Sequence, residues 1–136
     1  MIIGYTQGTY DMFHIGHLNL IKNAKNHCDY LIVGVNSDDL VETYKNKKTI
    51  IPIEERVAII EELKSVDKAI ICDTLDKIAI AKEMKVNKIF IGDDWKGNPR
   101  WEKTKQEMAE IGVEVVFLPH TDGTSSTMLR EKLSDY

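Results

Sequence analysis

Short apolar runs alternate with longer stretches in which apolar residues recur at helical spacing, and this alternation continues along the whole chain. A strand that is covered on both faces reads as an almost continuous apolar run, so these short runs are expected to be strands. The five expected strands span residues 1–6, 30–35, 68–72, 88–92 and 113–118. Strands that alternate with helices favour an open parallel sheet with helices on both faces.

The stretches between these runs are expected to be helices. The clearest runs from His17 to Cys28, where Leu20, Ile21 and Ala24 fall on one face. Four more helices are expected. One starts near Pro52, and the next runs through about Met84. A third carries Trp101, Thr104, Met108 and Ile111 on one face, and the last follows an N-cap at Ser125 or Ser126. No repeat or linker interrupts the pattern, so the sequence predicts one α/β domain over residues 1–136 with a five-stranded, Rossmann-like parallel sheet.

The charge balance narrows the class of ligand. The net charge of −4 argues against a broad nucleic-acid surface. Lys45, Lys47 and Lys48 nevertheless cluster in one short segment, and a local cationic patch on an acidic protein suits a small anionic ligand. A solvated loop is the alternative interpretation of the same charges.

The two cysteines and the distribution of apolar residues indicate the cellular compartment of the protein. Cys28 and Cys72 form neither a disulfide framework nor a CxxC pair, which is typical of a reducing cytosol. There is no run of about 18 apolar residues and no signal peptide with a basic start. A cytoplasmic protein without a membrane partner is therefore expected.

Polar segments follow four of the expected strands. They are residues 8–17, 37–39, 92–101 and 120–127. Ligands of open parallel sheets bind beyond the carboxyl ends of the strands. We therefore expect these segments to converge on one site.

The segment GTYDMFHIGH, residues 8–17, holds two of the four histidines of the chain. Gly8 and Thr9 leave the strand where backbone N–H groups are free, and Gly16 lets the chain approach a ligand. His14 and His17 lie near a helix N-terminus, which favours anions such as phosphate. A zinc site is disfavoured because no third His or Cys lies nearby. Turn packing with a capping histidine is the remaining alternative to phosphate binding.

HIGH at residues 14–17 resembles the HxGH signature that nucleotidyltransferases share with class I aminoacyl-tRNA synthetases. GTYD at 8–11, GDDWKG at 92–97 and TDGTSST at 121–127 make the chain similar to the cytidylyltransferase family in particular. The motifs occur in the family's order over essentially the whole chain.

The resemblance implies transfer of CMP from CTP to a small phosphorylated polyol, which yields a CDP-alcohol and pyrophosphate. Glycerol 3-phosphate is the best single acceptor, and Mg²⁺ or another divalent cation is expected to accompany CTP. Because a substrate phosphate is already ionised at pH 7, the reaction needs alignment and charge stabilisation rather than a nucleophilic side chain. The resemblance also implies a homodimer and, for CDP-glycerol, a role in cell wall or capsule polymer biosynthesis.

Other functions fit the same motifs. The acceptor could be a sugar phosphate, phosphocholine or phosphoethanolamine, and ATP could replace CTP. A catalytically silent nucleotide-binding domain is a third interpretation, although a protein that only binds nucleotides has less need of both histidines.

The resemblance also assigns roles to individual residues. The implied catalytic residues are His14, His17, Lys45, Lys47 and Arg56. The implied nucleotide-binding residues are Gly8, Thr9, Tyr10, Asp11, His14, Gly16, His17, Gly92, Asp94, His120, Thr121, Gly123, Ser125, Ser126 and Thr127. The implied acceptor-binding residues are Lys47, Lys64 and Trp95. Asp11 is also expected to lie close to the triphosphate and its metal ion.

Two positions depart from the family pattern. His120 stands where the family usually has an arginine, so it keeps a donor that is only partly charged near neutral pH. Lys64 also replaces a favoured arginine, and it keeps the charge without the bidentate fork. Trp101 shares a helical face with Met108, which favours a place in the core or at a subunit interface.

Overall fold

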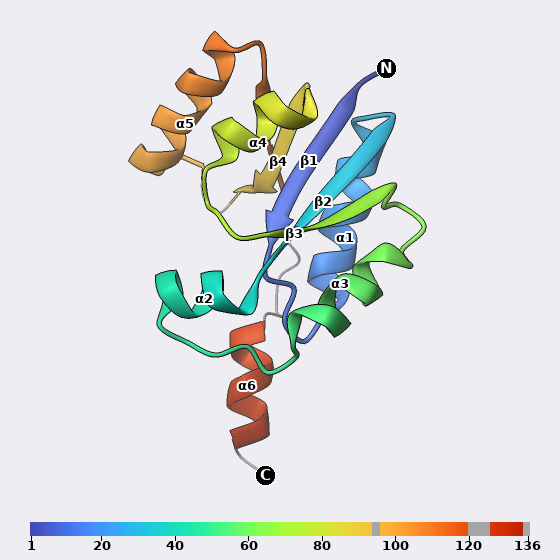
Figure 1. Cartoon of the computed structure of the whole chain (residues 1–136), viewed down its shortest axis with the longest axis vertical. Helices are drawn as coiled ribbons and strands as arrows, with labels where there is room; N and C mark the ends of the chain where they lie inside the picture. The colour runs from blue at the N-terminus through green and yellow to red at the C-terminus, as the bar shows by residue number, and fades with distance from the viewer. Residues whose placement is uncertain (94–95, 120–125, 135–136) are drawn as a thin grey trace.

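The computed structural model describes residues 1–93, 96–119 and 126–134 and contains a five-stranded, fully parallel sheet (Figure 1). The strands lie in the order β3-β2-β1-β4-β5. Their bounds are β1 Ile3–Gly8, β2 Tyr30–Asn36, β3 Lys68–Cys72, β4 Lys88–Gly92 and β5 Glu114–Leu118. The chain moves outward from β1 to β3 and then returns to β4, so the strand order reverses between β1 and β4. Such a reversal is where open α/β sheets bind ligands.

Helices cover both faces of this sheet (Figure 1). Their bounds are α1 Ile15–Asn26, α2 Asp38–Lys45, α3 Ile53–Glu61, α4 Lys77–Met84, α5 Pro99–Glu110 and α6 Ser126–Ser134. The side chains of α1 and α3 pack into one core cluster, and those of α4 and α5 pack into a second cluster on the opposite face. Within the described residues, no helix is long and apolar enough to cross a membrane. The predicted α/β fold with a Rossmann-like strand order is confirmed.

The apolar run of β2 shows why this strand could be recognised from sequence. Leu31, Val33 and Val35 are buried in the cluster beneath α1 and α3, whereas Ile32 is buried in the cluster beneath α4 and α5. Both faces of the strand are thus covered, which requires apolar residues at consecutive positions. Gly34 interrupts the run because a Cβ there would come within 2.2 Å of the Tyr5 hydroxyl oxygen.

Helix α2 was not expected from the sequence. Its first turn carries Asp38 and Asp39, which suit the positive end of the helix dipole, and the Ser37 hydroxyl caps it by accepting the Leu40 N–H. Val41 is its one buried residue. Its apolar residues, Leu40, Val41 and Tyr44, form only a short face, so the segment resembles a polar loop in the sequence.

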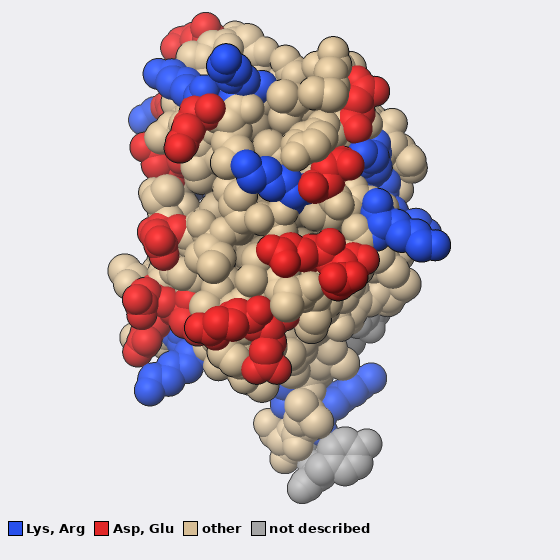
Figure 2. All heavy atoms as spheres, turned by 45° about the vertical axis from the view of Figure 1, so that its right-hand side comes forward, with Lys and Arg blue, Asp and Glu red and all other residues tan. Residues whose placement is uncertain are grey.

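The surface charge agrees with the acidic composition. Figure 2 shows Asp and Glu side chains gathered across the middle and lower part of one face, with Lys and Arg side chains among and around them. Helix α3 adds to the acidic surface of the protein, because its Glu54, Glu55 and Glu61 are exposed. The view shows no broad basic surface.

Candidate active site

The end of β1 and the start of α1 bring His14 and His17 together. The two rings stack with their centroids 3.9 Å apart and their planes 24° from parallel. His14 is the N-cap of α1, and its Nδ1 atom accepts the Gly16 N–H at 3.1 Å. In return, His17 Nδ1 accepts the His14 backbone N–H at 3.2 Å. The pair therefore forms a reciprocal capping box, with histidines in both roles.

These backbone contacts decide which ring nitrogen carries the proton. A nitrogen that accepts an N–H must be unprotonated, so each neutral ring holds its proton on Nε2. Burial lowers the pKa of His14. Burial, and secondly the neighbouring His14, lower the pKa of His17 to about 4, against a smaller opposing effect of Asp11. At neutral pH the pair is thus uncharged and presents two Nε2–H donors.

The capping and phosphate-binding interpretations of this motif are therefore compatible. The cap uses Nδ1 of each ring, and within the described part of the chain neither Nε2 atom of His14 or His17 has a hydrogen-bond partner. The predicted helix-terminal placement is present, and the cap itself aligns the two donors.

Tyr10 supports this pair from below. Its side chain is only 6% exposed, and its ring meets the His17 ring edge-on at 5.4 Å between centroids. A Cβ at Gly8 would come within 2.9 Å of the same tyrosine ring, which explains the glycine. The expectation that the Tyr10 side chain lines the nucleotide pocket is wrong, because the ring belongs to the core under α1 and α3.

Asp11 is also buried, with 2% exposure. Its carboxylate accepts the backbone N–H groups of Ile50 and Ile51, each at 2.9 Å, and it forms an ion pair with Arg130 of α6. Burial alone would raise the pKa of Asp11, but the two amides and the arginine outweigh it and hold the pKa below its usual value. The carboxylate thus ties the motif to the 46–52 connection and to α6.

The expectation that Asp11 lies close to the triphosphate and its metal ion stays a prediction, and the contacts of its carboxylate argue against a direct metal bond. Both of its carboxylate oxygens already bind protein donors. Within residues 1–93, 96–119 and 126–134, no group of three or more His, Cys, Asp or Glu side chains is placed to hold a metal ion.

The contacts of the Asp11 carboxylate predict that Asp11→Asn lowers the free energy of unfolding in a pH-dependent way. Because the folded-state pKa is lowered, the carboxylate stabilises the fold above its unfolded pKa of about 3.9, and this contribution disappears as the pH falls through the folded value. We expect the variant to lose about 1.5–3 kcal/mol of unfolding free energy at pH 7 in urea titrations, and less below about pH 4. Asp73→Asn, at an exposed position, should match the wild type throughout. An equal loss at pH 7 and pH 3 would contradict the charge-based account.

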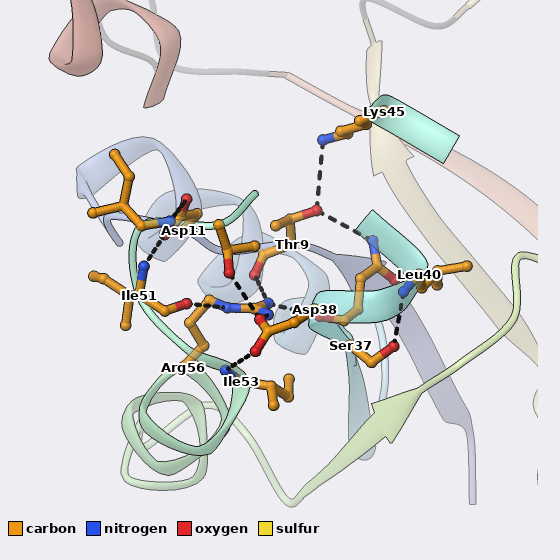
Figure 3. Close-up of polar contacts among 12 residues, drawn as sticks. Thr9, Asp11, Ser37, Asp38, Leu40, Lys45, Ile51, Ile53 and Arg56 are labelled. Atoms are coloured by element: carbon orange, nitrogen blue, oxygen red, sulfur yellow. Dashed lines mark hydrogen bonds and ion pairs between the residues drawn. The ribbon is translucent and has the colours of Figure 1, made fainter. Parts of the chain in front are cut away.

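Arg56 lies beneath the site and is 1% exposed (Figure 3). Its guanidinium donates to the carbonyl oxygens of Ile51 at 2.8 Å and of Thr9 and Asn36 at 2.7 Å each. It also forms an ion pair with Asp38. One side chain therefore joins the ends of β1 and β2 to the start of α2 and the 46–52 connection. The expectation that Arg56 is catalytic is wrong in that it positions the loops and has no surface open to a substrate.

The lysines of the basic segment separate in the structure. Lys45 ends α2 and places its Nζ atom 3.5 Å from the Thr9 hydroxyl (Figure 3). Lys47 lies on the connection that follows and is exposed, without a described contact to the site. Lys64 lies in the turn between α3 and β3, at the amino edge of the sheet. The expectation that Lys64 joins the site is therefore wrong within one chain.

A cleft of about 450 Å³ opens beside Thr9 on the side of α4 and α5. Its walls come from the ends of β1, β2 and β4 and from α2, α4 and α5. The residues that line it are Gln7, Gly8, Thr9, Asn36, Tyr44, Lys45, Leu75, Asp76, Lys77, Ile78, Ile91, Arg100, Trp101, Thr104 and Glu107. Most of these were not anticipated, because α4 and α5 carry no motif and meet the site only through the fold. Trp101 is 8% exposed and belongs to the core, as expected, with one edge on the cleft.

The remaining predicted residues are placed in part. Gly92 closes β4, and Gly16 lies in the first turn of α1. Helix α6 begins at Ser126, which leaves Ser126 and Thr127 at its N-terminus. Six predicted residues lie outside the described part of the chain, namely Asp94, Trp95, His120, Thr121, Gly123 and Ser125.

Curated relatives resemble the chain over nearly its full length. It is 36% identical to the glycerol-3-phosphate cytidylyltransferase of Bacillus spizizenii, over 95% of both chains. The enzyme of the same name from Bacillus subtilis is 32% identical over 95% of both chains. The one from Staphylococcus aureus is 34% identical over 94% of this chain and 92% of its own.

Solved structures share the fold. The lipopolysaccharide core biosynthesis protein of Thermoplasma volcanium superposes with a TM-score of 0.78 at 30% identity, over 90% of this chain and 99% of its own. Pantoate-beta-alanine ligase of Francisella tularensis reaches 0.61 at 16% identity, over 99% of this chain and 70% of its own, a likeness of fold alone. The cytidylyltransferase-like family model matches residues 5–132. With the HxGH pair at the strand-order reversal and relatives that align end to end, the chain belongs to the cytidylyltransferase-like family.

Proposed function

We propose that the protein transfers CMP from CTP to glycerol 3-phosphate and releases pyrophosphate. Three relatives that align with almost the whole chain carry the name of this activity. The observation that carries the proposal is the stacked pair of His14 and His17, which is neutral and offers two Nε2–H donors at the N-terminus of α1.

The chemistry requires no side-chain nucleophile. An oxygen of the ionised acceptor phosphate attacks the α-phosphorus of CTP, a new P–O bond forms, and the bond to the departing pyrophosphate breaks. Negative charge therefore moves toward the leaving group and the equatorial oxygens. Uncharged N–H donors that are already aligned stabilise this charge without reorganising during the reaction.

The acceptor is proposed to enter the cleft beside Thr9. The Lys45 ammonium group lies next to the Thr9 hydroxyl, so a phosphate there would meet one positive charge and one hydroxyl. The Asn36 amide donates to the same hydroxyl at 3.3 Å and holds it in place. A cleft of about 450 Å³ suits a small phosphorylated polyol.

A divalent cation is proposed to arrive with CTP, bound by the triphosphate oxygens, since Mg²⁺ commonly binds through substrate phosphates. The described residues do not fit a protein-held metal site, because Asp11 is fully engaged by backbone amides and Arg130. The homodimer and the supply of CDP-glycerol for wall or capsule polymers are further proposals that rest on the family resemblance, and the cytoplasmic location is a proposal that rests on the cysteine usage.

Pyrophosphate release tests the proposed function directly. CTP, ATP, UTP and GTP are each combined with glycerol 3-phosphate, a sugar phosphate, phosphocholine and phosphoethanolamine. We expect CTP with glycerol 3-phosphate to give the highest kcat/KM. Nucleotide binding without release from any pair would refute the enzyme and leave a nucleotide-binding domain.

A further inference from the structure

Two positive side chains on the wall of the cleft have no part in the steps described above. Lys77 is the first residue of α4, and Arg100 lies in the first turn of α5. Lys77 is half-buried, with its Nζ atom 5.3 Å from the centre of the Trp101 ring. Both side chains line the same cleft as Thr9 and Lys45.

Neither cation is neutralised within the described part of the chain, where no carboxylate lies within ion-pair distance of Lys77 or Arg100. Two acids, Asp76 and Glu107, also line the cleft, and neither forms an ion pair with Lys77 or Arg100. Asp76 caps α4 by accepting the Ala79 N–H at 3.1 Å, and Glu107 lies 4.0 Å from Lys103 on its own helix.

The charge of Arg100 also acts on Lys77. Burial, and secondly the positive charge of Arg100, lower the pKa of Lys77. Lys77 is half-buried and Arg100 is exposed, so water screens the repulsion between them only in part, and an empty cleft is costlier than one that holds a negative or strongly hydrogen-bonding group. The wall is therefore suited to an anion or to hydroxyl groups, and it opposes a second cation.

The position of this wall relates it to one end of the acceptor. Lys45 and Thr9 belong to α2 and the end of β1, whereas Lys77 and Arg100 belong to α4 and α5, which lie across from α2 (Figure 1). If the acceptor phosphate lies beside Lys45, the remainder of the molecule extends along the cleft toward Lys77 and Arg100.

Building on the proposed function, we propose that Lys77 and Arg100 select the acceptor by the charge of the end opposite its phosphate. Phosphomonoesters with hydroxyl or carboxylate groups at that end are favoured, and those with an ammonium group are repelled. Discrimination of this kind combines attraction to one ligand class with repulsion of another.

Three acceptors of similar size test this selection by kcat/KM at saturating CTP. They are glycerol 3-phosphate, 3-phosphoglycerate and phosphoethanolamine, which differ in the charge of the far end. In Lys77→Gln/Arg100→Gln, we expect phosphoethanolamine to gain about tenfold relative to glycerol 3-phosphate, which corresponds to about 1.4 kcal/mol. We expect 3-phosphoglycerate to lose about tenfold on the same scale.

Lys105→Gln is the matched control, because Lys105 is exposed on α5 and does not line the cleft. It should leave all three ratios unchanged. An equal change for the three acceptors in the double variant would overturn the selection, since it would place the two cations at the shared phosphate or at CTP.

Calorimetric binding of the same three compounds separates this inference from the proposed function. If the wild type transfers CMP to none of them, the proposed function fails. The selection then predicts that the wild type binds 3-phosphoglycerate more tightly than phosphoethanolamine and that the double variant narrows this difference by about tenfold. Equal binding of the three by the wild type would overturn it.

Discussion

His14→Asn is expected to lower kcat by about 10²- to 10³-fold, the usual effect of removing one aligned donor from a charge-stabilising site. Asparagine is among the best N-cap residues, and its side-chain oxygen can take the place of Nδ1 as acceptor of the Gly16 N–H. It has no group at the position of Nε2–H. The variant therefore separates the cap from the proposed phosphate contact.

His17→Asn makes the same separation for the second ring, because its side-chain oxygen can still accept the His14 N–H. The melting temperature checks each variant's fold, and steady-state kinetics separate kcat from KM. The control is His27→Asn at the exposed C-cap of α1, which should retain wild-type turnover. If folded His14→Asn and His17→Asn proteins keep wild-type rates, the two histidines serve only to cap the helix.

Arg56→Met is expected to lower the free energy of unfolding by about 3–5 kcal/mol, as for removal of one partner from a buried ion pair. The substitution leaves Asp38 without its guanidinium and the carbonyls of Thr9, Asn36 and Ile51 without their donor. Small domains have a total unfolding free energy of only about 5–15 kcal/mol, so this loss is a large share of it.

Urea titration measures this loss, with Lys64→Met as the control. Lys64 carries the same charge but is exposed in the turn before β3, so its replacement should change stability by less than about 0.5 kcal/mol. A stable Arg56→Met protein that has lost turnover would instead restore a direct catalytic role for the guanidinium.

The strands could be predicted from the sequence because they are buried on both faces. The histidine pair could be predicted because its hydrogen bonds are local. Strands such as β2 must be apolar at consecutive positions when helices cover both faces, and this requirement is visible without coordinates. His14, Gly16 and His17 are close in sequence, so their spacing already specified a helix-terminal unit. The sequence did not predict helix α2, because this helix buries a single residue.

The roles of the charged residues could not be read in this way. Arg56 reaches the Thr9 carbonyl across 47 positions, and Arg130 reaches Asp11 across 119. A motif shows that an acid or a base is present, but burial and partners decide whether it faces a ligand or holds two segments together. Asp11 and Arg56 illustrate this, because the contacts of both side chains hold separate segments of the chain together.

The sequence by itself determined the parallel α/β architecture and the helix-terminal placement of His14 and His17, since both follow from local periodicity and spacing. The tertiary structure alone decided that Lys45 lies beside Thr9, that Lys64 lies at the opposite edge, and that α4 and α5 add a second cationic wall. The physical reason is that helices far apart in sequence meet at the carboxyl edge of a parallel sheet, and only their packing fixes which side chains share a cleft.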